Sequence, residues 1–520
     1  MSRAGPRLRL ALALLLLVFA AASREGGACN ETCRRDIARC MATQCAGVPG
    51  ATCRRSCKPA AIRTLAYVVH ECRLDAAGMR VGHEELRIRR GDRQPITVVE
   101  FPGEPMPDPQ GLCRQYGESR NGTAAVLGGV LPRLGVSSDG SAVVFEVTDD
   151  TAAIHSLLPL PSDQKGMFLV RADGSGRRRL GPASRDPSFR IGPPGINTMY
   201  SFSVVFSTSI PFSPNGRRIA FTDLGPGPEG EETVQIVVLD LVSGRRTQVT
   251  HLPSASLPPS VPTPSFVTAY PTFIDDKTVL FFTYLDPDGS NPEHHLAGFT
   301  VQIDGGMLKP IPTPVGAAGG RVVPIFGVAQ LTTNLFNLTL PGVPANAFPG
   351  SDFPITEIFI QVGKNNLVQL THFNRVDTFS AFLNGTRTRA FFRASADPLR
   401  TNPSGNCQIF SVDTLGSGLR QVTHFNPGSP VTQPACDLDS PPNCFVGYEF
   451  VRQDPVTKTV VFDTACDPLG ANPFGDQIFA MRPDGTGLRQ LTDVAGFTTH
   501  PGGSVRVELP ALFAYSATLH

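Results

Sequence analysis

Residues 477–492 read QIFAMRPDGTGLRQLT, and residues 408–423 read QIFSVDTLGSGLRQVT. Both stretches begin with QIF and end with GLRQ, an aliphatic residue and Thr. In each, apolar and polar residues alternate, the alternation breaks at a glycine-containing segment, and the alternation then resumes. Period-two patterning on both sides of such a break predicts a β-hairpin and does not fit helical spacing.

Weaker copies of this unit run through most of the chain. A second predicted hairpin precedes most copies, with its break at turn formers such as Asp139-Gly140 and Asn215-Gly216. The repeating unit is therefore four strands long and recurs every 50 to 80 residues. The weaker copies occupy residues 85–101, 167–180, 235–250, 298–312 and 357–371.

A unit of four strands has two open edges and cannot bury both of its faces alone, so such units stack around an axis. The repeats therefore predict an all-β protein, a β-propeller of four-stranded blades over residues 61–520. Seven blades are favoured, because a lone C-terminal strand at 507–516 would join the N-terminal strands and complete their blade. Six blades, with residues 60–125 as a separate cap, is the alternative.

Two segments carry a resemblance to a known family. SPNGRRIAF at 213–221 and DGTGLRQLT at 484–492 closely resemble the two halves of the TolB-like, WD40-like propeller repeat. The resemblance covers residues 130–495 and departs from the family in having no Trp, although Phe212, Phe273 and Phe382 occupy comparable places. It implies the propeller fold without a single function, because such propellers serve binding, transport assemblies and some enzymes.

The N-terminus predicts export. Arg3, Arg7 and Arg9 precede an apolar run over residues 10–20, and small residues follow at 21–23, so residues 1–23 are interpreted as a signal peptide. A retained anchor is the alternative. We expect a secreted or periplasmic monomer with no transmembrane segment in the mature chain. The formal net charge of +1 gives no basis for binding nucleic acid.

Twelve cysteines in an exported chain predict disulfides. Six lie in residues 24–60, where four-residue spacings place cysteines on one helical face, so we expect a small helical hairpin module there. A metal site is the alternative for this module, and its pairing is one of fifteen that six cysteines allow. The expected pairs along the chain are Cys29–Cys57, Cys33–Cys53, Cys40–Cys45, Cys72–Cys113, Cys407–Cys466 and Cys436–Cys444.

Three histidines occupy one position of the repeat. His251, His372 and His424 each follow the terminal Thr of a copy, and equivalent positions on several blades lie on one rim. They are candidate ligands for a central molecule or a transition metal. Some TolB-like propellers are lyases that act on acidic oligosaccharides with a His-bound metal, so the resemblance implies an enzymatic alternative. The other interpretation, a consensus loop residue that fits a turn, is favoured.

An Asp-rich loop also recurs. Asp397 and Asn402 are spaced like Asp286 and Asn291, and residues 467–472 repeat the pattern. Oxygen ligands of this kind suit Ca²⁺, but Asp-Pro and Asn-Pro are also ordinary turn formers, which is the interpretation we favour.

No catalytic motif stands out in the sequence. The segment GVSSD at 135–139 lacks the closing glycine of a serine-hydrolase elbow. We therefore expect a non-catalytic propeller that binds a protein or cell-envelope component through its rim or central funnel, without a cofactor. The alternatives are a metal-dependent polysaccharide lyase or hydrolase that uses the rim histidines, and a structural surface protein.

Overall fold

The structure is a computed structural model. It describes residues 62–114, 130–149, 160–186, 211–254, 268–311, 322–323, 335–340, 355–384, 388–425, 436, 452–454, 459–470, 477–499 and 504–516, with a few short interruptions inside these ranges. The predicted signal peptide, the cysteine module at 24–60 with its six cysteines, and Cys444 lie outside the described residues.

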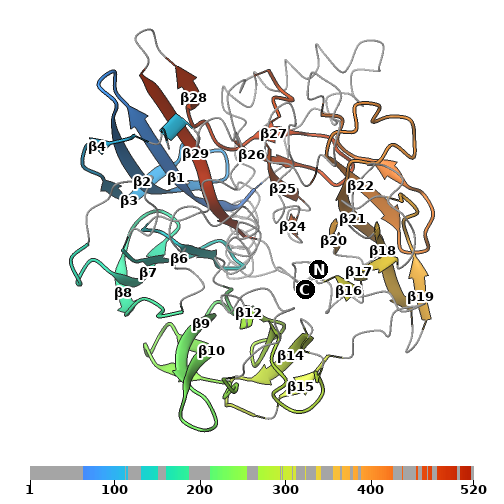
Figure 1. The fold of residues 1–520 in the computed structure, drawn as a ribbon, viewed down its shortest axis with the longest axis horizontal. Helices are drawn as coiled ribbons and strands as arrows, with labels where there is room; N and C mark the ends of the chain where they lie inside the picture. The colour runs from blue at the N-terminus through green and yellow to red at the C-terminus, as the bar shows by residue number, and fades with distance from the viewer. Residues whose placement is uncertain are drawn as a thin grey trace, which may run out of the picture.

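Within the described residues, the strands form seven antiparallel sheets arranged around a common centre (Figure 1). Four sheets follow one another from the N-terminal side. They contain β5 (Arg133–Val136), β6 (Ala142–Val147), β7 (Gly166–Arg171) and β8 (Arg178–Gly181); β9 (Arg218–Pro226), β10 (Glu232–Asp240) and β11 (Arg246–Gln248); β12 (Thr268–Phe273), β13 (Thr278–Thr283), β14 (Ala297–Gln302) and β15 (Lys309–Pro310); and β16 (Val322–Val323), β17 (Leu335–Leu340), β18 (Ile355–Val362) and β19 (Asn366–Gln369).

Two further sheets have the same order of strands. They contain β20 (Phe379–Leu383), β21 (Arg389–Ala394), β22 (Gln408–Asp413) and β23 (Arg420–Gln421); and β24 (Arg452–Asp454), β25 (Thr459–Thr464), β26 (Gln477–Met481) and β27 (Arg489–Gln490). The β9–β11 sheet has three strands, and Phe212 bridges to Ile219 of β9 at the place where the other sheets have their first strand.

The last sheet joins the two ends of the described chain, and we call it the closing blade. It contains β28 (Gly496–Thr499), β29 (Val505–Tyr515), β1 (Thr64–Leu74), β2 (Met79–Arg90), β3 (Ile96–Pro102) and β4 (Met106–Pro107). Strand β29 pairs with β1 from Leu65↔Tyr515 to Leu74↔Val505, with one register shift between Val68 and Val69. In Figure 1 the red strand β29 lies directly beside the blue strand β1.

The apolar cores lie between neighbouring sheets. On β6, Phe145 packs into a cluster shared with the closing blade, whereas the adjacent Val144 packs into a cluster shared with β9 and β10. This alternation follows from the period-two geometry of a strand, which sends successive side chains to opposite faces. In the described residues, apolar clusters of this kind join neighbouring sheets in sequence from β16–β19 through the closing blade to β12–β15, which is the stacking of an all-β propeller.

Phenylalanines recur at the centre of these interfaces. Stacked pairs join the second and third strands of four sheets, with ring centroids 5.5 to 6.1 Å apart. Aromatic pairs at this separation contribute packing beyond their buried area. The pairs are Phe145–Phe168, Phe281–Phe299, Phe392–Phe410 and Phe462–Phe479.

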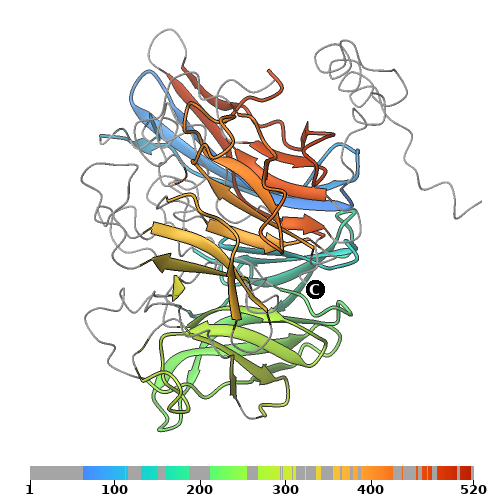
Figure 2. The same ribbon diagram turned by 90° about the vertical axis from the view of Figure 1, so that its right-hand side faces the viewer.

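The two ends of the sheets differ. Turns between the first and second strands and between the third and fourth strands, such as 137–141 and 482–488, lie at one end, which we call the turn end. Turns of neighbouring sheets touch there: Ser138 donates to the carbonyl of Pro214 at 2.9 Å. The other end, the loop end, carries the connections between second and third strands and from one sheet to the next. Figure 2 shows the sheets from the side.

The structure corrects two expected disulfides. Cys72 pairs with Cys113, as expected, but Cys407 pairs with Cys436 instead of Cys466, so the expected Cys436–Cys444 pair is also wrong. Cys466 is disulfide-bonded as well. Related positions on stacked sheets lie roughly 10 Å apart, beyond the reach of a disulfide, whereas Cys407 and Cys436 have a Cα–Cα distance of 4.8 Å.

Among the described residues, no helix combines the length and the apolar character that crossing a bilayer requires.

Candidate functional site

The repeat motif builds a polar clasp at the loop end. In the β20–β23 blade, Thr423 Oγ1 donates to Gln408 Oε1 at 2.8 Å, and Gln408 Nε2 donates to the carbonyl of Phe425 at 2.6 Å. The amide of Ile409 donates to Thr423 Oγ1 at 2.8 Å. Gln235 and Gln477 make the same set of bonds in their own blades. The Gln and Thr of the motif are therefore structural residues that fix the loop end of these three blades.

In the β16–β19 blade, a buried glutamate replaces this glutamine. Glu357 is 1% exposed and accepts hydrogen bonds from Thr371 Oγ1 at 2.5 Å and from the amide of Asn374 at 2.7 Å. Asn374 has a φ of 56°, the left-handed conformation that Asn tolerates. Burial raises the pKa of Glu357, and the bonds from Thr371 and the backbone only partly offset it.

The three candidate histidines lie just beyond these clasps. His251, His372 and His424 directly follow the clasp threonines and are exposed at the loop end of three separate blades. His251 Nδ1 lies 3.2 Å from Gln248 Nε2, within its own blade. No contact among the described residues brings any two of the three together. The repeat thus accounts for their common position without requiring a shared ligand.

The recurring Asp and Asn residues hold their own loops. The amide of Asn402 donates to Asp397 Oδ1 at 2.7 Å, and the amide of Asn291 donates to Asp286 Oδ1 at the same distance. The Asn402 side chain donates to the carbonyl of Asn406 at 2.8 Å. In the described part of the chain, no group of three or more His, Cys, Asp or Glu side chains could hold a metal ion. These loops have the bonding of structural turns.

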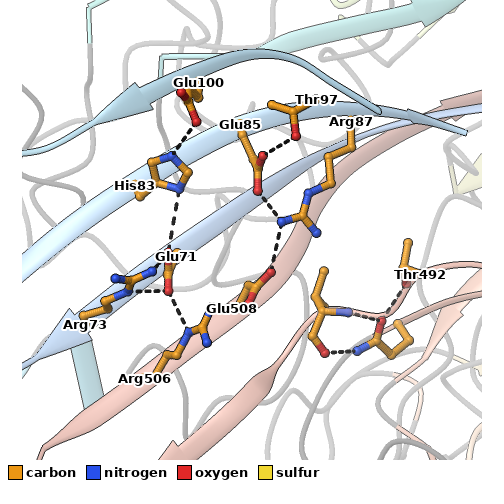
Figure 3. Close-up of polar contacts among 12 residues, drawn as sticks. Glu71, Arg73, His83, Glu85, Arg87, Thr97, Glu100, Thr492, Arg506 and Glu508 are labelled. Atoms are coloured by element: carbon orange, nitrogen blue, oxygen red, sulfur yellow. Dashed lines mark hydrogen bonds and ion pairs between the residues drawn. The ribbon is translucent and has the colours of Figure 1, made fainter. Parts of the chain in front are cut away.

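A network of charged side chains lies on one face of the closing blade (Figure 3). Glu71 on β1 accepts bonds from Arg73 at 2.6 Å and from Arg506 on β29 at 2.7 Å. Arg87 on β2 bonds to Glu85 and reaches Glu508 on β29 at 3.3 Å. These ion pairs cross from the N-terminal strands to the C-terminal strand, so they fasten the two ends of the ring.

In this network the side chains of Glu71, Glu85 and Glu508 are more buried than the arginines with which they pair. The Glu71 side chain is 6% exposed, whereas those of Arg73 and Arg506 are 61% and 42% exposed. Burial alone would raise the pKa of Glu71, but the bond from Arg73 and the charge of Arg506 outweigh it and hold the pKa below its usual range. His83 lies 3.7 Å from Glu71 and 3.8 Å from Glu100. Sequence reasoning missed the network because no local motif links residues 71–87 with 506–508.

A second charged cluster lies between the β5–β8 and β9–β11 blades. Arg133 and Glu146 are almost fully buried, and their Nε and Oε2 atoms lie 3.2 Å apart. Arg133 also donates to the carbonyl of Thr222 at 3.1 Å. Burial raises the pKa of Glu146, and the charge of Arg133 opposes that rise. Arg133 and Glu146 are opposite each other on β5 and β6 of one blade, and the bond from Arg133 to Thr222 reaches the next blade.

A pocket opens where β3 of the closing blade faces β6 and β7. Its volume is about 550 Å³, within the range of ligand-binding pockets. The floor is apolar, with Phe101 and Phe145 buried and the Phe168 ring stacked on Phe145 at 5.5 Å. The lining residues are Val99, Glu100, Phe101, Phe145, Val147, Asp163, Gln164, Phe168 and Arg177. Because three separate strands and two loops contribute, no single stretch of sequence could reveal it.

No protein-family model matches the chain, and no curated protein matches it. Solved structures do. TolB from Acinetobacter baumannii is 13% identical with a TM-score of 0.33, covering 91% of this chain and 84% of that one. The oligogalacturonate lyase from Vibrio parahaemolyticus is 9% identical with a TM-score of 0.39, covering 81% of this chain and 90% of that one.

The tricorn protease is 14% identical with a TM-score of 0.34, covering 72% of this chain and 27% of that one. The present chain thus spans about a quarter of the length of that protein. At these low TM-scores the similarities add no argument about function. The propeller assignment is made from the sheets of the chain itself.

Proposed function

We propose that this chain is an exported, non-catalytic β-propeller of seven blades that binds a protein or cell-envelope component. One observation carries the proposal: the pocket beside β3 combines an apolar floor with the exposed polar side chains of Asp163, Gln164 and Arg177. The side chains of these three residues make no hydrogen bond or ion pair with the other residues that the structure describes. Ligand-binding pockets typically combine an apolar lining with a few polar groups that can bond to the ligand.

Other observations support export, the number of blades and the monomeric state. The disulfides Cys72–Cys113 and Cys407–Cys436 favour an oxidising compartment, in keeping with the signal peptide predicted at 1–23. The closing blade and the six other sheets of the described residues favour seven blades over six. A ring that closes on itself leaves few open sheet edges, which favours a monomer.

Partner capture from the native envelope fraction tests the binding role. Purified protein is cross-linked to that fraction in parallel with Phe168→Ala/Arg177→Glu, which alters the pocket, and with Leu415→Ala, which changes an exposed turn-end residue. We expect one partner that wild type and Leu415→Ala both capture and that the pocket variant loses. Equal capture by all three proteins would exclude the pocket as the binding site.

A metal-dependent lyase or hydrolase is the second candidate. It is favoured by the exposure of His251, His372 and His424 at one repeat position on the loop end. Metal analysis of the purified protein separates the two proposals. Stoichiometric Mn²⁺, Zn²⁺ or Ca²⁺ that is lost in His372→Ala/His424→Ala, together with turnover of uronate oligosaccharides, would establish the enzyme and reject the non-catalytic role.

A further inference from the structure

The pocket lies along β3, which is unusually long for an outer strand. The outer strands β8, β11, β15, β19, β23 and β27 have two to four residues, whereas β3 has seven. At the Ile96 end, the closing blade touches its neighbour: a Cβ at Gly174 would lie 2.8 Å from the Ile96 side chain. Further along β3, Val99, Glu100 and Phe101 line the pocket between the two blades.

The charges around this pocket are opposite in sign and are not neutralised by one another. Asp163 and Arg177 both line the pocket and are exposed, yet no ion pair joins them or links either to another described residue. Other exposed charges do form ion pairs in the described residues, such as Arg217–Asp240 at 2.8 Å and Lys165–Asp149 at 2.9 Å. The Glu100 side chain adds a second carboxylate and is 68% exposed.

We propose that this pocket binds a short peptide that has free ends and a large apolar side chain. The inference rests on the binding role proposed above and names the class of ligand. The apolar side chain packs on the floor formed by Phe101, Phe145 and Phe168. The ammonium group of the peptide pairs with the carboxylates of Asp163 and Glu100, and its carboxylate accepts hydrogen bonds from the Arg177 guanidinium, which suits planar carboxylate groups.

Calorimetric titration with the dipeptide Phe-Ala tests the proposal on the full chain. For a ligand of this size we expect a Kd on the order of 0.1 mM. The N-acetylated form and the C-amidated form each remove one charge, and each should bind about tenfold more weakly. Absence of saturable binding by the free dipeptide, or equal affinities for all three forms, would overturn the proposal.

Substitution of Arg177 locates the carboxylate. Arg177→Gln should weaken binding of the free dipeptide about tenfold and leave the affinity for the C-amidated form unchanged. Arg171→Gln, on the exposed end of β7 but outside the pocket lining, is the matched control and should leave both affinities unchanged. If Arg177→Gln weakens both forms equally, or Arg171→Gln has the same effect, the assignment is wrong.

The two proposals fail differently. If Phe-Ala does not bind while the pocket variant still loses its captured partner, only the ligand class is rejected. If peptide binding and partner capture are both absent, the binding role of the pocket is rejected as well.

Discussion

At the scale of single residues, the most informative side chains are the clasp glutamines on the third strands, Gln235, Gln408 and Gln477. Gln408 is fully enclosed and uses both its oxygen and its nitrogen, so it joins the start of β22 to the segment that leaves the blade. An exposed histidine directly follows the threonine in three of these arrangements, whereas Asp493 follows Thr492 in the fourth. A residue that recurs at one position of a repeat is therefore more readily explained by the fold than by function.

Gln477→Ala tests the clasp. The substitution leaves Thr492 Oγ1 and the carbonyl of Val494 without their buried partner, so we expect a loss of about 2 to 4 kcal/mol of unfolding free energy. Leu415→Ala, at a residue 86% exposed, should cost less than about 0.5 kcal/mol. Urea denaturation measures both. A loss for Gln477→Ala as small as that of the control would contradict the structural role of the clasp.

A glycine at the turn end offers a second test at this scale. Gly485 has a φ of 84°, and a Cβ there would lie 2.6 Å from the carbonyl oxygen of Val422 in the preceding blade. Gly244 occupies the corresponding turn of the β9–β11 blade with a φ of 71°, and a Cβ there meets nothing within 4 Å. We expect Gly485→Ala to cost about 2 to 4 kcal/mol and Gly244→Ala about 1 kcal/mol.

The difference between the two glycine variants isolates the contact between blades, because the backbone strain is common to both. Thermal unfolding at matched scan rates measures it. Equal shifts in Tm would show that the turn of one blade does not pack against the outer strand of the one before it.

At the scale of elements, the closing blade depends on ion pairs that cross from β29 to β1 and β2. The pKa of Glu71 lies below its usual range, so its ionised form is favoured in the folded protein. Its contribution to stability is therefore present above the unfolded pKa of about 4.5 and is lost as the pH falls through the lower folded value. The ion pairs of Glu71 with Arg73 and Arg506 should therefore weaken in acid.

Glu71→Gln checks this linkage. At pH 7 the variant should lose about 1 to 3 kcal/mol of unfolding free energy, because Arg73 and Arg506 lose the carboxylate that they share. The difference from wild type should shrink as the pH falls below about 4.5. Glu100→Gln, in the same sheet with an exposed side chain, should change little at any pH. A deficit for Glu71→Gln that is independent of pH would contradict the account.

Local elements were largely readable from the sequence. The run at 477–481 is strand β26 and the turn at 213–217 closes a hairpin, because period-two patterning and turn formers are local signals. The second half of each motif was less regular than expected: β23 and β27 have only two residues, since the motif threonine bonds to the Gln side chain. The β-propensity of the residues does not reveal that a side-chain bond replaces strand pairing at this point.

At the scale of the whole molecule, the sequence predicted stacking but not the distances between stacked sheets. The expected Cys407–Cys466 pair failed because related positions on neighbouring blades are one sheet spacing apart. The pocket escaped prediction for a related reason, since its lining combines β3 of the closing blade with residues of the β5–β8 blade. Features that combine residues from several blades can be recognised only once the arrangement of the blades is known.

The pairing of β29 with β1 is the claim on which the ring depends, and an engineered cross-link tests it directly. Leu74 and Val505 are opposite each other in the register, so Leu74→Cys/Val505→Cys should form a disulfide within one chain, detected by mass spectrometry of the digested monomer. Leu74→Cys/Arg506→Cys places the second cysteine one residue out of register, on the other face, and should not. Cross-linking in the second pair alone, or only between two chains, would contradict closure of the propeller by its own C-terminal strand.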